Sequence, residues 1–375
     1  MANKKLEAQI TELLTQADVQ VNGQRPWDIQ VHNPDVYERV AKAGSLGFGE
    51  AYMDGWWNAV KIDELIYRIL KADLAHVGLH HVSPSLLIQL IKTYALPAGR
   101  KRRAFEVGER HYDLGNDLFE AMLDSRLIYS CGYWRTASTL TEAQDAKLDL
   151  ICRKLQLKAG MRLLDIGGGW GGLARFAAEK YGVHVVSMTV SKEQKALADT
   201  LSAGLPVENR LQDYRTLAEV FDAVVSVGMF EHVGPRYYRT YFKTVARCLA
   251  PNGLFLLHTI GHNISGKFSD PWITRYIFPN SALPSVKQIA SAIEGHFIME
   301  DWHNFGTDYD RTLMAWYANF EAAWPSLKAK YDERFHRTWR YYLLSSAAGF
   351  RARSLQLWQV VLSKHGVAGG YESVR

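Results

Sequence analysis

Short apolar runs alternate with helical segments along the C-terminal two thirds of the chain. The first five runs are residues 162–166, 183–188, 207–211, 221–227 and 254–260. Strands that are buried on both faces of a parallel sheet are almost continuously hydrophobic, and the helical segments between them supply right-handed crossovers. Two later runs, 297–302 and 356–363, are typical of an antiparallel hairpin at the end of such a sheet. The pattern predicts an α/β fold with a seven-stranded, mostly parallel sheet.

The first hundred residues have a different pattern, which predicts a smaller N-terminal α+β domain. Apolar residues at helical spacing predict helices near residues 6–14, 62–70 and 85–94. Residues 19–31 alternate apolar and polar side chains around Asn22-Gly23, which predicts a β-hairpin. Further along, Trp56 and Trp57 lie at a lipid interface if they are exposed, or pack in the core.

The boundary between the two domains is a proline-containing stretch followed by a run of cations. We expect residues 1–97 to form the N-terminal domain, residues 98–105 a basic linker and residues 106–375 the larger domain. The linker contains four consecutive cations, Arg100, Lys101, Arg102 and Arg103. Because a cation near an anionic membrane contributes about 1 kcal/mol to binding, this segment either contacts lipid headgroups or is a solvated connector.

Composition excludes several classes of protein. A hydrophobic content of 47% with 22% charged residues is typical of a soluble globular protein, and a net charge of +5 is too small to indicate nucleic-acid binding. The three cysteines form no Cys-x-x-Cys pair, so we expect neither a structural metal site nor disulfides, and a reducing cytoplasm. We recognise no secretory segment and no apolar stretch of membrane-spanning length, so we expect any lipid contact to be peripheral.

A glycine-rich turn follows the first strand of the predicted sheet. The strand ends at Asp165, and Gly167, Gly168 and Gly169 lead into a helix. Glycines here let the backbone approach a bound molecule, so the turn is a candidate ligand site. One interpretation is a dinucleotide site and another is a tight structural turn. The spacing Asp-x-Gly-x-Gly resembles the first motif of class I S-adenosylmethionine-dependent methyltransferases.

Polar residues at the ends of the next two strands are candidates for holding a nucleoside. No acidic residue follows the second strand, but Thr189 and Gln194 can hydrogen-bond a ribose. After the third strand, Gln212 and Asp213 lie where an adenine amino group would be bound, unless they are ordinary polar loop residues.

The fourth and fifth strands end in a second group of polar residues. Glu231 and His232 follow the fourth strand, and His258 lies at the end of the fifth. Because the carboxyl ends of parallel strands meet at one edge of the sheet, these groups are positioned for a ligand. We expect them to converge with Cys131 and Tyr309.

Aromatic residues are dense in the C-terminal half. Such rings can line an acyl-chain tunnel and stabilise a cationic intermediate, although most pack in cores. They are Trp272, Tyr276, Phe278, Trp302, Phe305, Tyr309, Trp316, Tyr317, Phe320 and Trp324.

Several motifs together resemble the cyclopropane-fatty-acyl-phospholipid synthase family, which is related to the mycolic acid cyclopropane synthases. The resemblance covers nearly the whole chain, including residues 49–57, which the shorter mycolic acid enzymes lack. The motifs are Tyr129-Ser130-Cys131, the glycine turn with Trp170, residues 189–194, Phe230-Glu231-His232-Val233-Gly234, Leu257-His258-Thr259-Ile260 and residues 278–285.

The resemblance implies a fold, a reaction and a set of site residues. The fold is a class I methyltransferase, Rossmann-like domain at 106–375, with a lipid-related N-terminal domain. The enzyme transfers a methylene group derived from the methyl of S-adenosyl-L-methionine to a cis double bond in a phospholipid acyl chain. A carbocation forms, and bound bicarbonate deprotonates it to close the ring. The implied bicarbonate ligands are Cys131, Glu231, His258, the backbone of Ile260, and Tyr309. The implied cofactor-binding residues are Tyr129, Ser130, Gly167, Gly168, Gly169, Thr189, Gln194, Gln212 and Asp213.

The resemblance also implies a homodimer in the cytoplasm, peripherally associated with the inner face of the cell membrane.

Two positions depart from the family pattern, because members commonly have Cys where this chain has Gly168 and Ser346. Neither position can therefore act as a thiol nucleophile here. Two alternatives remain, methyl transfer to an amine by the same type of catalytic domain and a non-catalytic protein that binds lipid or senses S-adenosylmethionine.

Overall fold

The computed structural model describes residues 2–72, 115–266 and 269–375. The chain divides into two compact units, which we call the sheet unit and the helical unit. The sheet unit consists of Arg102–Lys267, Asn280–Thr312 and Leu355–Arg375, and the helical unit of Met1–Lys101, Phe268–Pro279 and Leu313–Ser354. The expected helix at 85–94 and the basic linker at 98–105 lie outside the described residues.

The sheet unit contains a seven-stranded sheet with the strand order β5-β4-β3-β6-β7-β9-β8. The strands are β3 (Arg162–Ile166), β4 (His184–Thr189), β5 (Val207–Leu211), β6 (Phe221–Val227), β7 (Leu249–His262), β8 (Ile298–Asn304) and β9 (Leu355–Ser363). The first five pair in parallel, whereas β9 is antiparallel to both β7 and β8. Each overlaps a run predicted from hydrophobicity, so the α/β class and the strand count are confirmed. Because β3 lies between β4 and β6, the connections reverse there, and ligands of open sheets bind at such a point.

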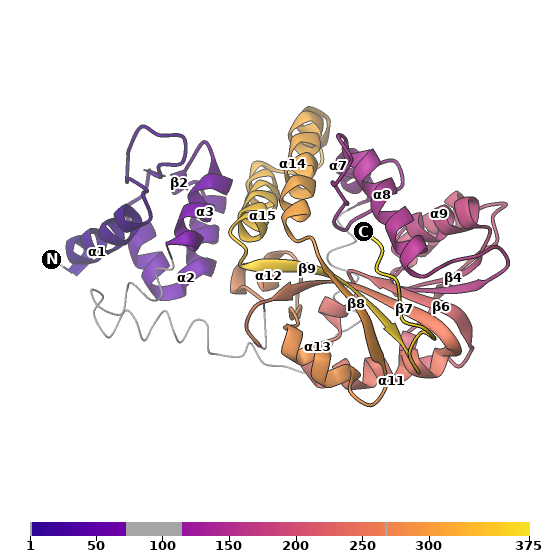
Figure 1. Ribbon diagram of the computed structural model, residues 1–375. Coiled ribbons are helices and arrows are strands. Elements are labelled where there is room, and N and C mark those ends of the chain that lie inside the picture. The colour runs from indigo at the N-terminus through magenta and orange to yellow at the C-terminus, as the bar shows by residue number, and fades with distance from the viewer. Residues whose placement is uncertain (1, 73–114, 267–268) are drawn as a thin grey trace. The chain divides into compact units, whose positions relative to one another are not determined.

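Helices cover both faces of this sheet, and each face has its own hydrophobic core. Helices α11 (Tyr238–Cys248) and α13 (Val286–Ile293) lie on one face, and α8 (Leu140–Lys154) and α9 (Gly172–Tyr181) on the other (Figure 1). The remaining helical segments are α7 (Asn116–Met122), α10 (Lys192–Leu201), η1 (Tyr214–Thr216), η2 (Phe230–His232) and η3 (Pro235–Tyr237). Successive strand side chains point to opposite faces, so Leu164 belongs to the first core and Leu163 to the second.

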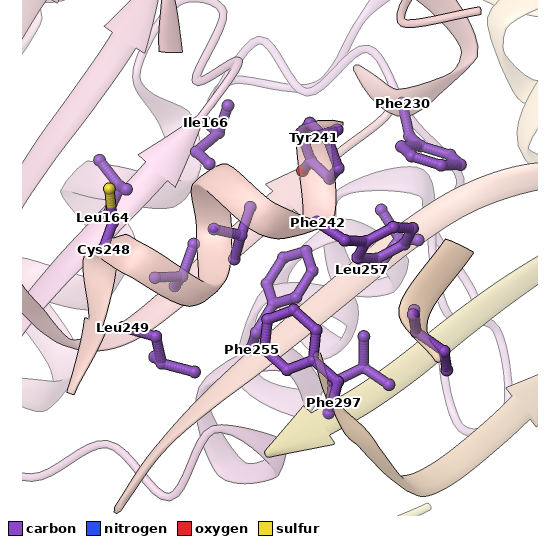
Figure 2. Close-up of a cluster of buried hydrophobic side chains, with 14 of the residues drawn as sticks. Leu164, Ile166, Phe230, Tyr241, Phe242, Cys248, Leu249, Phe255, Leu257 and Phe297 are labelled. Atoms are coloured by element: carbon purple, nitrogen blue, oxygen red, sulfur yellow. The ribbon is translucent and has the colours of Figure 1, made fainter. Parts of the chain in front are cut away.

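The first core anchors the turn that follows β6. Figure 2 shows its aromatic side chains, among them Phe230, Tyr241 and Phe242. Phe230 is fully buried and stacks on Tyr238 with ring centroids 4.3 Å apart. Burial of an aromatic ring contributes strongly to stability, so η2 is held firmly at the carboxyl end of β6.

The helical unit combines N-terminal helices with helices from the C-terminal half. It contains α1 (Ala2–Gln16), β1 (Gln30–Val31), α2 (Val36–Met53), β2 (Trp57–Asn58), α3 (Ile62–Lys71), α12 (Pro271–Tyr276), most of α14 (Thr307–Leu327) and α15 (Glu333–Arg351). The guanidinium of Arg337 in α15 donates to Tyr52 O at 2.6 Å, Trp57 O at 3.0 Å and Asn58 Oδ1 at 2.7 Å. Within residues 2–72, 115–266 and 269–375, no helix combines the length and apolar character needed to cross a membrane.

The predicted β-hairpin at 19–31 is wrong. Residues 30–31 form β1, which pairs with β2, and Val21 and Ile29 form an isolated parallel bridge. The buried carboxylate of Asp28 accepts hydrogen bonds from the backbone N–H groups of Gln20 and Arg25, so it organises this segment as a loop.

The tryptophan pair supports the core interpretation. Trp57 is fully buried, stacks on Phe48 with centroids 4.3 Å apart, and donates from Nε1 to Phe48 O. Trp56 is half-buried beneath the guanidinium of Arg39.

The contacts of Arg337 generate a stability prediction. Arg337→Met removes three hydrogen bonds and the cation–π contact with the Tyr52 ring, so we expect the free energy of unfolding to fall by about 2–4 kcal/mol. The matched control is Arg334→Met on the same helix, where an exposed ion pair with Asp54 and a hydrogen bond with the Tyr276 hydroxyl are lost, and we expect the free energy of unfolding to fall by less than about 1 kcal/mol. Chemical denaturation measures the free energy of unfolding of both variants. Equal losses would contradict the stabilising role of the three Arg337 hydrogen bonds.

Candidate active site

The glycine turn after β3 is held by the neighbouring strand and leaves open space beside it. The backbone N–H groups of Gly167 and Gly168 both donate to Met188 O, at 3.0 and 2.9 Å. Gly169 has φ 56°, and a Cβ placed on it would meet no atom within 4 Å. The turn therefore presents bare backbone to an open region, as a ligand cradle requires.

Gly168 is packed against a polar pair. A Cβ at this position would lie 1.8 Å from Ser187 Oγ and 2.8 Å from Asp165 Oδ2. Asp165 is buried at the end of β3, and burial raises the pKa of its carboxyl to about 7 although the Ser187 hydroxyl donates to it. The serine therefore occupies the volume that a cysteine at position 168 would need.

The predicted nucleoside-binding residues lie at the carboxyl ends of β4 and β5. Thr189 donates from its hydroxyl to Gln194 Oε1 at 2.8 Å, and both side chains are buried. Gln212 continues this edge, because its N–H donates to Thr189 O. Asp213 caps η1, and its carboxylate pairs with the guanidinium of Arg215, which lowers the pKa of that carboxyl. The structure brings the first three together and shows Asp213 committed to a local ion pair.

Tyr129 and Ser130 lie on a loop that is held by hydrogen bonds from two side chains of α8. Ser130 is buried, its carbonyl accepts from Gln144 Nε2 at 2.8 Å, and its hydroxyl accepts from Lys147 Nζ at 2.9 Å. Tyr129 packs edge-on against Phe119, with ring centroids 5.2 Å apart.

Lys147 is a site residue that the sequence reasoning missed. Its side chain is 1% exposed, and burial lowers the pKa of its ammonium group to about 8, opposed by attraction to Asp124, Cys131 and Asp165. The available signal was the spacing of Gln144 and Lys147, three residues apart, which places both polar side chains on one face of α8 toward the Ser130 loop.

Glu231 is the most strongly constrained of the predicted catalytic residues. Its Oε1 accepts from the N–H of Ile260 at 2.7 Å, which joins the turn after β6 to the end of β7. Its Oε2 is buried and has no hydrogen-bond partner within the described part of the chain. Burial raises the pKa of the Glu231 carboxyl to about 7, opposed by the Ile260 hydrogen bond. The neighbouring His232 is solvent-accessible, and desolvation lowers the pKa of its imidazole to about 4.

His258 lies two residues before Ile260 on β7 and is also buried. Strand register pairs it with Val227 at the end of β6, and its carbonyl accepts from the N–H of Gly228 at 3.0 Å. Its Nδ1 lies 3.2 Å from Gln359 Nε2, whereas its Nε2 has no hydrogen-bond partner among the described residues. Burial lowers the pKa of this imidazole well below its ordinary value, so the ring is neutral.

Cys131 and Tyr309 are placed by the first turns of α14, within the part of that helix that belongs to the sheet unit. Thr312 Oγ1 accepts from Gly132 N and Trp134 Nε1 and lies 3.9 Å from Cys131 Sγ. Tyr309 is buried one turn earlier on the same helix. Burial raises the pKa of the Cys131 thiol well above its ordinary value, so it stays protonated.

An aromatic bridge joins the Cys131 loop to His258. The ring of Phe305 lies 5.2 Å from Tyr133 and 5.9 Å from His258, measured between centroids. The structure therefore joins Glu231 directly to Ile260, places His258 two residues away on the same strand, and links the Cys131 loop to His258 through Phe305. Of the other aromatic residues, Trp272, Trp316 and Phe320 are core residues of the helical unit.

The strand order, the glycine turn after β3 and the polar residues at the ends of β4, β6 and β7 define a class I, Rossmann-like, S-adenosylmethionine-dependent methyltransferase. Residues 99–360 match the family model described as mycolic acid cyclopropane synthetase, and the chain belongs to that family.

Relatives and solved structures agree with this assignment. The chain is 54% identical over 364 residues to the cyclopropane-fatty-acyl-phospholipid synthase of Escherichia coli K12, covering 97% of this chain and 94% of the relative. The cyclopropane synthase MmaA2 from Mycobacterium tuberculosis has a TM-score of 0.65 at 31% identity, covering 71% of this chain and all of that one. The mycolic acid cyclopropane synthase CmaA1, complexed with SAH and CTAB, has a TM-score of 0.66 at 33% identity, covering 70% and 99%.

The raised pKa of Glu231 predicts a pH-dependent stability difference. The pKa of its carboxyl in the folded protein, about 7, lies above the ordinary glutamate value of 4.5, so its favourable contribution to stability is complete below pH 4.5 and is lost as pH rises through 7. Glu231→Gln keeps an acceptor for Ile260 without the charge. Relative to wild type, we expect it to gain up to about 3 kcal/mol of stability between pH 5 and pH 8. Exposed Glu372→Gln is the control for unfolding measured at both pH values, and a pH-independent difference would refute the prediction.

The packing of Gly168 predicts a coupled pair. Gly168→Ala forces Ser187 away from Asp165, so we expect the free energy of unfolding to fall by about 1–3 kcal/mol. Ser187→Gly removes the obstructing hydroxyl. Gly168→Ala should therefore lower the free energy of unfolding less in the Ser187→Gly background than in the wild type. Denaturation of all four proteins gives the coupling energy, and strictly additive effects would show that the two positions do not compete for the same volume.

Proposed function

We propose that this protein transfers a methylene group derived from the S-adenosylmethionine methyl to the cis double bond of unsaturated acyl chains in membrane phospholipids. The product is a cyclopropane ring. The observation that carries the proposal is the buried Glu231–Ile260–His258 cluster at the methyltransferase ligand edge, in a chain 54% identical to a cyclopropane-fatty-acyl-phospholipid synthase.

The residues of the sheet edge fit S-adenosylmethionine, which when bound supplies an electrophilic methyl on a sulfonium. Gly167, Gly168 and Gly169 give it a backbone cradle, and Gly169 faces open space. Thr189 and Gln194 offer hydrogen bonds for a ribose, Gln212 and Asp213 for the adenine, and Tyr129 and Ser130 cover the methionine portion. The buried carboxyl groups of Asp165 and Glu231 are compatible with the positive charge of the cofactor.

A small anion completes the site in this proposal. Bicarbonate is held by the Cys131 thiol, His258, the backbone of Ile260 and Tyr309, with Glu231 orienting it and balancing charge. The neutral imidazole is suited to donate a hydrogen bond to an anion, and the protonated Cys131 thiol, which donates to Gly132 O at 3.1 Å, would have to turn its proton toward the anion. Lys147 Nζ, on the Ser130 hydroxyl, adds a buried positive charge nearby.

The chemistry needs a base because the ring closes only when the carbocation loses a proton from the newly added methyl group. When the alkene π electrons form a bond to the methyl carbon, the sulfur–methyl bond would break, its electron pair would leave on the sulfur of S-adenosylhomocysteine, and a carbocation would remain on the acyl chain. A base held between these residues, which we propose to be bicarbonate, would accept a proton from the new methyl group, and the electrons of that C–H bond would close the ring. A site closed to water protects the carbocation, and Phe305 beside His258 supplies an apolar wall.

The substrate lies in a membrane, so the protein associates peripherally with the inner face of the cell membrane from the cytoplasm. The region 1–97 serves lipid binding, residues 98–105 contact anionic headgroups, and residues 106–375 form the catalytic domain. A homodimer is the proposed assembly. Methyl transfer to an amine is the competing function, since it uses the same fold but requires no base to remove a carbon-bound proton.

A labelling assay separates the two functions. The protein is incubated with methyl-labelled S-adenosylmethionine and vesicles of unsaturated phospholipid, or with candidate amines, with bicarbonate supplied or removed. We expect label in the lipid, a mass gain of one methylene per double bond, and loss of turnover without bicarbonate.

The matched variants test the role of Glu231 in the same assay. Glu231→Gln should lower turnover at least ~100-fold while cofactor affinity stays nearly unchanged, and Glu372→Gln should match wild type. Label found in amines and absent from lipid would overturn the proposal.

A further inference from the structure

A buried glutamine lies beside His258 in the middle of an apolar strand. Gln359 is fully buried in β9, where Trp358, Val360 and Val361 are also buried. Strand register pairs it with His258 on β7 and with His303 on β8, so the three side chains share one face of the sheet. A buried amide in such a strand is costly unless it is hydrogen-bonded; its contact with His258 supplies one such bond, whereas Gln359 Oε1 has no hydrogen-bond partner among the described residues.

The contact between the two side chains determines where the imidazole proton lies. Gln359 Nε2 is 3.2 Å from His258 Nδ1, and an amide nitrogen can only donate. Nδ1 must therefore accept. Because burial keeps the ring neutral, its single proton is on Nε2.

The surroundings favour this orientation of the amide. On the β8 side, the buried Lys154 has its Nζ 3.1 Å from His303 Nδ1 and 3.6 Å from Asp301 Oδ2. When Lys154 is protonated, its charge favours the amide oxygen of Gln359 on the β8 side over the amide nitrogen, although no hydrogen bond joins the two, and this orientation leaves the amide nitrogen facing β7 and His258.

We propose that Gln359 is a positioning residue that fixes His258 as the Nε2–H tautomer, so that the buried and unpaired Nε2 is a hydrogen-bond donor to the anion beside Glu231. This inference rests on the proposed function for the identity of that anion. In the opposite tautomer, Nε2 would present a lone pair to the anion. Together with the nearby Glu231 carboxylate, that lone pair would repel the anion. Gln359 was not recognised from the sequence as a site residue.

The first test reads the tautomer directly. Long-range proton–nitrogen correlation spectra of the full chain, labelled with nitrogen-15 histidine, distinguish a protonated from an unprotonated ring nitrogen, and His258→Asn identifies the signals of residue 258. We expect a protonated Nε2 and an unprotonated Nδ1 in the wild type. Gln359→Glu places an acceptor against Nδ1, so the proton should move to Nδ1 or the ring should become doubly protonated.

A matched control is available on the same strand. Gln356 is buried and hydrogen-bonded to Asn304, but its odd separation from Gln359 places it on the other face. Gln356→Met loses a buried amide without touching His258, so the tautomer should remain as in wild type. An Nδ1–H tautomer in the wild type, or an unchanged tautomer in Gln359→Glu, would overturn the proposal.

The second readout is kinetic. Gln359→Glu should raise the bicarbonate concentration for half-maximal rate roughly 10- to 100-fold, the effect of losing a hydrogen bond to a charged group, while KM for S-adenosylmethionine stays constant. If the tautomer is Nε2–H and bicarbonate has no effect on any variant, the anion of the proposed function fails and the tautomer assignment stands. If the rate still depends on bicarbonate but the His258 ring carries its proton on Nδ1, the proposed role of Gln359 is wrong and the proposed function stands.

Discussion

The site depends on one hydrogen bond, from the N–H of Ile260 to Glu231 Oε1. It joins the turn after β6 to the end of β7 and holds a carboxyl group in a place where water does not reach. The other oxygen of Glu231 and the Nε2 of His258 are left buried without partners among the described residues. Buried polar atoms are normally satisfied, so such a pair is a feature expected of a site completed by ligands. The stacked aromatic core beneath η2 prevents the turn from relaxing toward solvent.

Much of this arrangement follows from elementary rules of parallel sheets. Apolar runs predicted all seven strands, and the same-edge rule predicted that residues after β4, β6 and β7 would be neighbours. Glu231 and His258 were accessible to this reasoning because Glu231 lies in the turn after one apolar run and His258 lies near the end of another. The relationship to the cyclopropane synthase family came from motifs spread over the chain and is confirmed by the family match and the 54% identity to the E. coli enzyme.

The rest required coordinates because the determining contacts cross between elements. Lys147 and Gln359 lie within ordinary helix and strand patterns, and only the packing of α8 on the Ser130 loop and of β9 on β7 shows their polar contacts. At residues 19–31, alternating polarity gave the wrong answer, since the tertiary hydrogen bonds of Asp28 outweighed the local strand pattern. Trp57 was ambiguous because the same ring suits a core or an interface, and its burial decided for the core.

The central claim is that these buried groups surround a small anion next to the methyl donor. A crystal structure of the protein with S-adenosylhomocysteine, a cofactor product, and bicarbonate tests it most directly. The account predicts a planar anion within hydrogen-bonding distance of His258 Nε2 and the Cys131 thiol, adjacent to Glu231. A structure in which bicarbonate is absent from this position at saturating concentration, or in which Cys131 and Tyr309 point away from Glu231, would contradict it.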